Sequence, residues 1–168
     1  MGDWRKSLPE MTDPTTALDG FQLALLSGIE LKRGVLHKDL YVYVDHPQGE
    51  TRFTFVTLEG KTVSSFVEFV SGQPIKGTQN FSIGYAVPEA YRKQGRGKKA
   101  VEAAIAEMRH VLGQYVMPFY IEAIVGEENT ASRRIAEQLI SDSPVKMKDG
   151  ISGLPAFRYV RKIEQATP

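Results

Sequence analysis

Residues 81–100 read FSIGYAVPEAYRKQGRGKKA, and this stretch decides the fold. An apolar run, 81–87, predicts a strand that ends at Pro88, and an amphipathic helix is predicted over about 95–112. Between them lies the cationic turn 92–97, RKQGRG. Its glycines let backbone N–H groups approach an anion, and a helix start adds unpaired N–H groups and the positive end of the helix dipole. The stretch therefore predicts a site for a phosphorylated ligand.

The composition is that of a soluble globular domain. The chain has 168 residues, is 42% hydrophobic and 24% charged, and carries a formal net charge of +1. The charge of residues 92–99 is therefore local, and we expect no nucleic-acid partner. No apolar run has the length of a membrane span and no signal peptide begins the chain, so a cytoplasmic protein without a membrane partner is expected.

Metal and thiol chemistry are not expected. The chain has no cysteine, which excludes disulfides, thiolate metal sites and a cysteine nucleophile. His37, His46 and His110 are scattered and fit no metal-ligand spacing, so we predict no metal.

The chain is organised as a disordered N-terminus, 1–13, and one domain, 14–163. Apolar residues at helical spacing over 14–32 compete with Gly20 and Gly28, so this segment is ambiguous. The rest of the front half predicts an antiparallel meander of three strands, 40–44, 52–58 and 62–70. A loop is predicted over 71–79.

The second half predicts one βαβ unit, a helix and a last strand. Residues 119–125 form a near-continuous apolar run, typical of a buried parallel strand. Asn129 is a favourable N-cap for the next helix, and 153–163 reads as the last strand. The fold class is therefore α/β, with a mixed sheet whose front half is antiparallel.

Three interpretations of the glycine turn compete. Gly95-x-Gly97-x-x-Ala100 fits the dinucleotide fingerprint, but that motif needs its strand to run directly into the first glycine, and 88–94 intervene. A nucleotide-triphosphate P-loop fails because no Gly-Lys-Ser/Thr follows. The third interpretation adds the arginine three residues earlier, giving Arg92-x-x-Gly95-x-Gly97.

This third pattern resembles the coenzyme A signature of the GCN5-related N-acetyltransferase (GNAT) superfamily, and the order of elements matches as well. The resemblance implies the acyl-CoA N-acyltransferase fold and acetyl-CoA as cosubstrate. It implies that backbone groups of Tyr85, Ala86 and Val87 bind pantetheine. It also implies that the turn holds the pyrophosphate, through Arg92, Lys93, Gln94, Gly95, Arg96, Gly97 and Lys98.

A second resemblance lies downstream. Ile121-Glu122-Ala123, followed by the NTASRRI stretch at 129–135, is similar to the IEA…NxxSxRV stretch of the ribosomal-protein N-terminal acetyltransferase branch. It implies that Asn129 and Ser132 lie near the coenzyme. Ala136 stands where several family members carry a tyrosine that protonates the departing thiolate, so that role is unassigned.

Amide formation from a thioester needs a base for the amine and a proton for the thiolate. Glu122, inside an apolar strand where desolvation raises a carboxyl pKa, is the first candidate for the base, and Glu68 is the second. Both also fit structural roles on a wet strand face or beside an arginine. Tyr120 and Tyr159 are the candidates for the acid, against simple packing roles.

The expected function is transfer of an acetyl group from acetyl-CoA to a primary amine by direct attack in a ternary complex. The acceptor, a small molecule or a protein N-terminus, stays open, and so does a homodimer. Two alternatives remain: a non-catalytic GNAT-fold protein that binds acyl-CoA as a sensor or interaction module, and a small phosphate- or nucleic-acid-binding domain.

Overall fold

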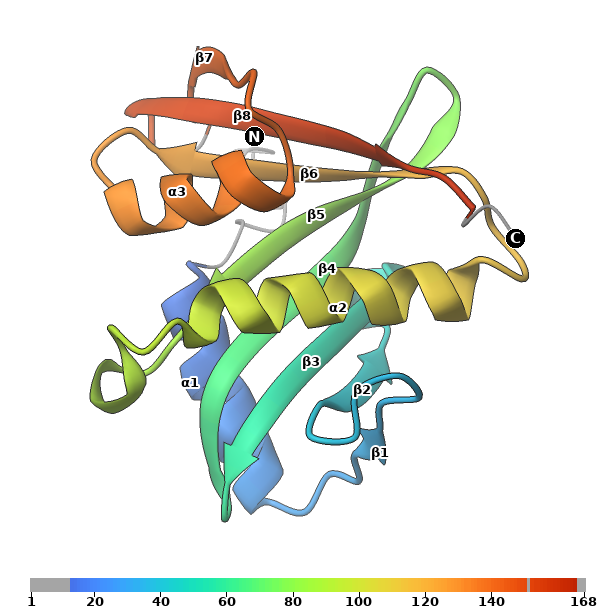
Figure 1. Ribbon diagram of the computed structural model, residues 1–168, viewed down its shortest axis with the longest axis vertical. Coiled ribbons are helices and arrows are strands. Elements are labelled where there is room, and N and C mark those ends of the chain that lie inside the picture. Colours follow the sequence, from blue (N-terminus) through green and yellow to red (C-terminus); the bar gives the residue numbers. More distant parts are fainter. Residues whose placement is uncertain (1–12, 151, 166–168) are drawn as a thin grey trace, which may run out of the picture.

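In the computed structural model, residues 13–150 and 152–165 are described, and they form an eight-stranded sheet with helices on both faces (Figure 1). The order across the sheet is β1-β2-β3-β4-β5-β6-β8-β7, in which β5 and β6 are parallel and the other neighbours are antiparallel. This confirms the predicted α/β fold with a mixed sheet. The strands are β1 Lys32–Arg33, β2 Tyr41–Asp45, β3 Arg52–Glu59, β4 Thr62–Ile75, β5 Thr78–Ala86, β6 Phe119–Gly126, β7 Val145–Lys148 and β8 Pro155–Ile163.

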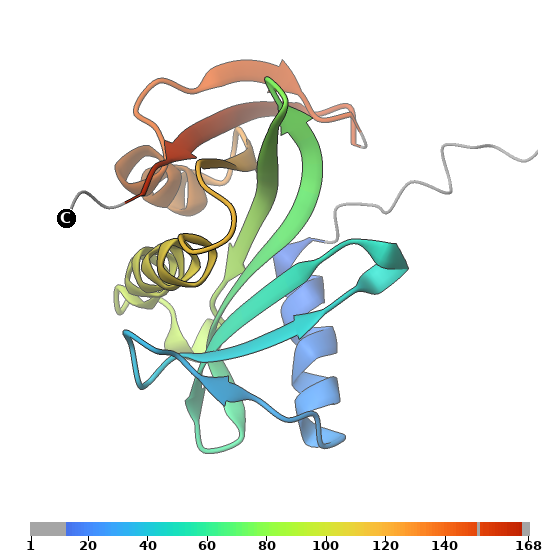
Figure 2. The same cartoon turned by 90° about the vertical axis from the view of Figure 1, so that its right-hand side faces the viewer.

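Two helices, α2 (Arg96–Leu112) and α3 (Thr130–Leu139), cover one face of the sheet, and α1 (Pro14–Leu26) lies on the other (Figure 2). The predicted stripe of α2 is buried in the main core, at Val101, Ala104, Ile105, Met108 and Leu112. No helix in the described ranges is long and apolar enough to cross a membrane.

The ambiguous segment at residues 14–32 begins with a helix. Asp13 caps α1 by accepting a hydrogen bond from the Thr15 N–H at 2.8 Å, and Pro14 occupies the first turn, where its missing N–H costs nothing. Gly20 is tolerated inside α1, where a Cβ would meet no atom within 4 Å. The predicted disorder of 1–13 falls, except for Asp13, outside the described residues.

The predicted loop over 71–79 is wrong. β4 continues to Ile75 and β5 begins at Thr78, joined by a two-residue turn in which Lys76 (φ 50°) and Gly77 (φ 74°) are both left-handed. Gly72 and Pro74 are of residue types that ordinarily interrupt a strand. They are accommodated because the register shifts between Gly72 and Ile75.

Two short strands, β1 and β7, were not predicted from the sequence. They lie at the two edges of the sheet and pair with β2 and β8 respectively. With two and four residues, they are too short for a period-two pattern to be recognised.

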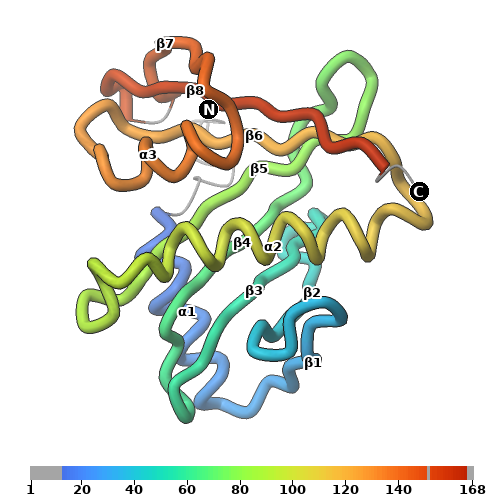
Figure 3. The backbone as a smooth tube through the Cα atoms, in the orientation of Figure 1, coloured from blue at the N-terminus to red at the C-terminus, as the bar shows by residue number. Residues whose placement is uncertain are grey.

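The strands β5 and β6 separate after a short parallel contact. Residues Asn80–Ser82 of β5 pair with Tyr120–Glu122 of β6. Beyond this contact the strands diverge, as β5 continues to Ala86 and β6 to Gly126 (Figure 3). Since α2 follows β5 and α3 follows β6, the N-termini of both helices lie at the open end of this gap. We call this region, β5 83–86 and β6 123–126, the splay.

A buried carboxylate ties the loop before β2 to α2. Glu107 is 1% exposed and accepts hydrogen bonds from the N–H groups of Val35 (3.0 Å), Leu36 (2.6 Å) and His37 (2.7 Å). Burial alone raises the pKa of Glu107, but these backbone donors outweigh it and the net pKa is lowered.

Glu107→Gln is expected to lower the free energy of unfolding by about 1–3 kcal/mol at neutral pH, because an amide cannot accept three N–H bonds as well as a carboxylate does. A group with a lowered folded-state pKa stabilises above its unfolded pKa, and this stabilisation is lost as the pH falls through the folded pKa. The difference between the proteins should therefore shrink in acid. Urea denaturation from pH 7 down to pH 3 measures it, and Glu102→Gln, an exposed position on the same helix, is the control. Equal stabilities at pH 7 would contradict the role of Glu107.

Candidate active site

The turn between β5 and α2 has a backbone that glycine makes possible. A short 3-10 helix, Glu89–Tyr91, follows Pro88, and the turn then reaches Gly95, the N-cap of α2, at φ 73° and ψ 10°. This left-handed conformation is strained for residues with a Cβ. The Arg92 Nε donates to the Val87 carbonyl at 2.9 Å and closes the turn on itself. Among the residues that the structure describes, no side chain caps α2, so the N–H groups of its first turn remain available to an anion.

Gly97 allows three elements to approach closely at the splay. A Cβ at this position would lie 3.0 Å from Ile135 Cδ1 on α3 and 3.6 Å from Val87 Cγ2 at the end of β5. The first turn of α2 is therefore packed against both α3 and β5, with the glycine at the point of contact. The turn fits a pyrophosphate on two counts: N–H donors at a helix start, and no side chain in the way.

The start of α3 is joined to β5 by hydrogen bonds. Asn129 caps the helix by accepting a hydrogen bond from the Ser132 N–H at 3.2 Å, as predicted. The Ser132 carbonyl accepts a hydrogen bond from the Tyr85 hydroxyl at 2.6 Å. The predicted cofactor residues on β5, in the turn and on α3 are thus brought together around the splay. The Tyr85 hydroxyl contact was not predicted, and the sequence holds no signal for it.

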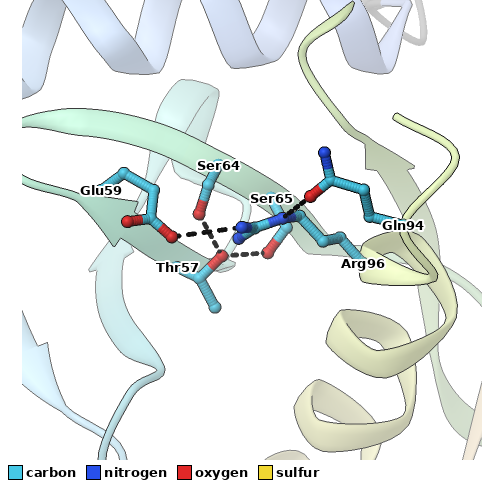
Figure 4. A network of polar contacts seen from close by, with 6 residues as sticks. All are labelled: Thr57, Glu59, Ser64, Ser65, Gln94 and Arg96. Carbon is cyan, nitrogen blue, oxygen red and sulfur yellow. Dashed lines mark hydrogen bonds and ion pairs between the residues drawn. The ribbon is translucent and has the colours of Figure 1, made fainter. Parts of the chain in front are cut away.

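The side chains of Gln94 and Arg96 leave this group and point to the other side of α2 (Figure 4). Arg96 donates to Gln94 Oε1 at 3.0 Å and forms an ion pair with Glu59 of β3 at 3.2 Å. Any contribution of these two residues to a pyrophosphate site is thereby limited to their backbone groups and to the long-range charge of Arg96.

Glu122 lies at the last paired position of β6, opposite Ser82, where the splay begins. Its neighbours Ile121 and Ala123 are buried beneath the helices, so Glu122 points to the opposite face of the sheet. There it forms an ion pair and hydrogen bond with Arg158 of β8. Arg158 was not singled out in the sequence, although the strand alternation places it on that face.

Glu68 lies on the same face and has a different environment. It is 9% exposed and makes no hydrogen bond or ion pair with any residue in the described ranges. Burial raises its pKa, Arg52 nearby opposes this rise, and Asp45 adds to it. Glu68 is paired with Gly84 of β5, where a Cβ would lie 3.6 Å from the Glu68 Oε1. The same Cβ would lie 3.2 Å from Pro14 Cγ, so the glycine lets the start of α1 pack closely against β5 beside the Glu68 carboxylate.

Tyr159 and Tyr85 bring two hydroxyl groups beneath α3. Tyr159 is fully buried, and its hydroxyl donates a long hydrogen bond to Glu137 at 3.4 Å. Burial raises the pKa of Tyr85 well above its usual range, and the Tyr159 hydroxyl adds to this rise. Ala136, the position of the missing helix tyrosine, is the buried residue of α3 itself. Tyr120 is half-buried.

The splay between two parallel strands, with a glycine turn and two helix starts at its open end, defines an acyl-CoA-binding transferase fold. The model of the Acetyltransferase (GNAT) family matches residues 26–139, and the chain belongs to this family. No curated protein sequence matches the chain.

Solved structures of low sequence identity share the fold. One is RimL, the ribosomal L7/L12 alpha-N-protein acetyltransferase, in complex with coenzyme A (19% identity, TM-score 0.54, 72% of this chain and 67% of that chain). Another is yncA from Salmonella typhimurium, a putative acetyltransferase, with acetyl-CoA (18% identity, TM-score 0.52, 71% of this chain and 68% of that chain). The match to a GNAT-family acetyltransferase from Streptococcus pneumoniae extends over more of both chains (11% identity, TM-score 0.52, 90% of this chain and 96% of that chain).

Asn129 is expected to separate stability from cofactor binding. Asn129→Ala should lower the free energy of unfolding by about 0.5–2 kcal/mol because the α3 cap is lost. Asn129→Asp keeps the capping oxygen, so stability should hold, while the added negative charge raises the Michaelis constant for acetyl-CoA. Thermal unfolding and steady-state kinetics of both variants test this. Unchanged kinetics in Asn129→Asp would reduce Asn129 to a structural residue.

Proposed function

We propose that this GNAT-family acetyltransferase transfers the acetyl group of acetyl-CoA to a primary amine by direct attack in a ternary complex. The observation that carries the proposal is the splay. The glycine turn and both helix starts lie on its one side, and a buried carboxylate, Glu68, lies on the other. A donor and an acceptor brought in from opposite faces of the sheet would meet at the gap.

The cosubstrate would be held by the residues that the resemblance implied. β5 has no strand partner on its β6 side beyond Ser82, so backbone groups of Tyr85, Ala86 and Val87 are available to pantetheine along that edge. The N–H groups of the Arg92–Gly97 turn, with Lys93 and Lys98 exposed beside them, suit the pyrophosphate. Asn129 and Ser132 would flank it from α3. When bound, acetyl-CoA supplies the thioester whose acetyl group is transferred.

Glu68 is the carboxylate best suited to take the proton of the amine. An ammonium with a pKa near ~10.4 must lose a proton before it can attack. A carboxylate with a raised pKa and no hydrogen-bond or ion-pair partner among the described residues is a better proton acceptor than one held by an arginine, so the geometry favours Glu68 over Glu122. In this proposal Glu122 and Arg158 orient the acceptor beside the splay.

The remaining steps need one donor for the oxyanion and one for the thiolate. As the C–N bond forms, the backbone N–H of Val87 would donate to the acetyl oxygen. The C–S bond then breaks, and the thiolate takes a proton from the Tyr159 hydroxyl, which is hydrogen-bonded to Glu137. The nitrogen loses its second proton as the amide forms, and this proton returns Tyr159 to its neutral form. The products are the amide and coenzyme A, and no covalent enzyme intermediate is involved.

The acceptor is proposed only as a class, a primary amine of a small molecule or a protein N-terminus. Polyamines, amino acids, antibiotic amines and peptides with free N-termini are the candidates. A cytoplasmic location and a homodimer remain predictions.

The test is acetyl-CoA turnover with a panel of these amines, followed as release of the coenzyme A thiol. Turnover with at least one amine, at a rate above hydrolysis without amine, is expected. Binding of coenzyme A without transfer to any member of a broad panel would argue for a non-catalytic acyl-CoA-binding role. Absence of coenzyme A binding by calorimetry would overturn the proposal.

A further inference from the structure

A second cavity lies on the far side of α2 from the splay. It has a volume of about 530 Å³, within the range of small-molecule sites. Its walls come from the loop before β2, the β3–β4 hairpin, the cofactor turn and one face of α2, and no residue of β5, β6 or α3 lines it. The Arg96 side chain lines this cavity and reaches toward Glu59 of β3 (Figure 4). This cavity is distinct from the proposed acyl-transfer site.

The floor of the cavity carries a buried cluster of hydroxyl groups. A β-bulge sets Ser64 and Ser65 both opposite Thr57, and the Thr57 Oγ1 lies 2.8 Å and 2.6 Å from the two serine oxygens. Ser64 is 0% and Ser65 1% exposed, and Thr57 and Ser65 line the cavity.

The cluster has one more O–H donor than its internal hydrogen bonds use. Three hydroxyl groups carry three O–H donors, and the two contacts between them use two. No other acceptor in the described part of the chain receives the third. A buried donor without an acceptor is costly, so the floor of the cavity calls for an oxygen acceptor on a ligand.

The mouth and walls narrow the class of ligand. Lys99 carries a positive charge at the mouth and makes no ion pair within the described residues, whereas Arg96 is partly neutralised by Glu59. Asp39 and Glu102 stand at the same mouth, which disfavours ligands with several negative charges. The walls between mouth and floor are aliphatic, formed by Leu40, Ala100, Ala103 and Ala106.

We propose that this cavity is a binding site for a small aliphatic monocarboxylate. The carboxylate accepts the spare hydroxyl donor at the floor, and the hydrocarbon part lies against the alanine face of α2. Lys99 at the mouth adds a positive potential that favours an anion over a neutral or cationic ligand. The site needs neither the cofactor nor an amine, so the outcome of its test is independent of the proposed acetyl transfer.

Butyrate, with n-butylamine and 1-butanol as probes of the same size, tests the proposal by ¹⁵N NMR titration of the free protein. Butyrate is expected to shift the amide resonances of Ser65, Lys99 and Ala103, with a dissociation constant on the order of 1 mM for so small a ligand. Butylamine and butanol are expected to leave them in place. Equal shifts with butyrate and butylamine, or no saturable shift with butyrate, would overturn the proposal.

Variants locate the site. Ala103→Leu fills the cavity and should weaken butyrate binding at least about tenfold, and Ser65→Ala removes the floor hydroxyl and should weaken it as well. Lys99→Gln, an exposed change that leaves the fold intact, should weaken it several-fold, whereas Lys148→Gln on β7 is the matched control and should not. Wild-type affinity in both Ala103→Leu and Lys99→Gln would place the butyrate elsewhere and sink the assignment.

Discussion

Gly97→Glu is expected to abolish detectable binding of coenzyme A. The new side chain begins at a Cβ that lies 3.0 Å from Ile135 Cδ1, at the junction of β5, α2 and α3. It also brings a negative charge to a helix start where a pyrophosphate is proposed to bind, so packing and electrostatics act in the same direction. Isothermal titration calorimetry with coenzyme A measures the loss. Normal affinity in this variant would show that the cofactor site is misplaced.

Two further variants separate packing from charge in that result. Gly97→Ala adds only the Cβ, so any loss of coenzyme A affinity in this variant comes from packing against Ile135. The double variant Gly97→Ala/Ile135→Ala removes the side chain that the Cβ meets, and it should restore much of that lost affinity. The same trimming should not restore Gly97→Glu. Lys148→Glu, the same final side chain on a distant edge strand, controls for net charge, and thermal unfolding of every variant controls for folding.

The second half of the fold was predictable because its signals are local and strong. The stripe of α2, the Asn129 cap and the apolar run of β6 each use a period or a cap that a few neighbouring residues specify. The parallel pairing of β5 with β6 then followed from the connection through α2, since a crossover of this length joins parallel strands.

The errors in the front half came from features that tertiary structure overrides. Gly72 and Pro74 ordinarily end a strand, but here a register shift lets β4 and β5 continue as a long hairpin. Gly20 weakened the prediction of α1, whose apolar residues Leu18, Phe21 and Leu25 pack on the sheet and stabilise the helix in spite of it.

The candidate site also divides into residues that a local motif predicts and residues whose roles depend on tertiary contacts. The turn 92–97, which we propose holds the pyrophosphate, is a contiguous motif, and its residues lie together at the splay, apart from the side chains of Gln94 and Arg96. The ranking of the two glutamates depended on contacts across strands. Arg158 engages Glu122 from β8, and Gly84 lies opposite Glu68 on β5. Neither pairing is visible before the strand register is known.

Glu68→Gln is expected to lower turnover about 10²–10⁴-fold while leaving the affinity for coenzyme A nearly intact. The amide keeps the shape of the side chain but accepts no proton. Glu68 alternates with Val67 and Phe69, which pack in the core beneath the helices, so it lies on the opposite face of the sheet. The loss should shrink at high pH, where more of the amine is already deprotonated. Steady-state kinetics from pH 6 to pH 10, together with calorimetry for coenzyme A, measure these effects.

Stability separates this catalytic loss from structural damage. Burial raises the pKa of Glu68, so folding favours its protonated form, and ionisation above the unfolded-state pKa costs stability as the pH rises toward the folded pKa. Glutamine removes that cost, so Glu68→Gln should be at least as stable as the wild type at neutral pH while it is far less active.

Glu122→Gln should show the opposite pattern of stability and activity. Its stability should fall because the ion pair with Arg158 is weakened, and its turnover should fall less than that of Glu68→Gln. A fully active Glu68→Gln enzyme at neutral pH beside an inactive, stable Glu122→Gln enzyme would reverse the two roles. If both variants are active, the proton leaves through ordered water and neither glutamate is the base.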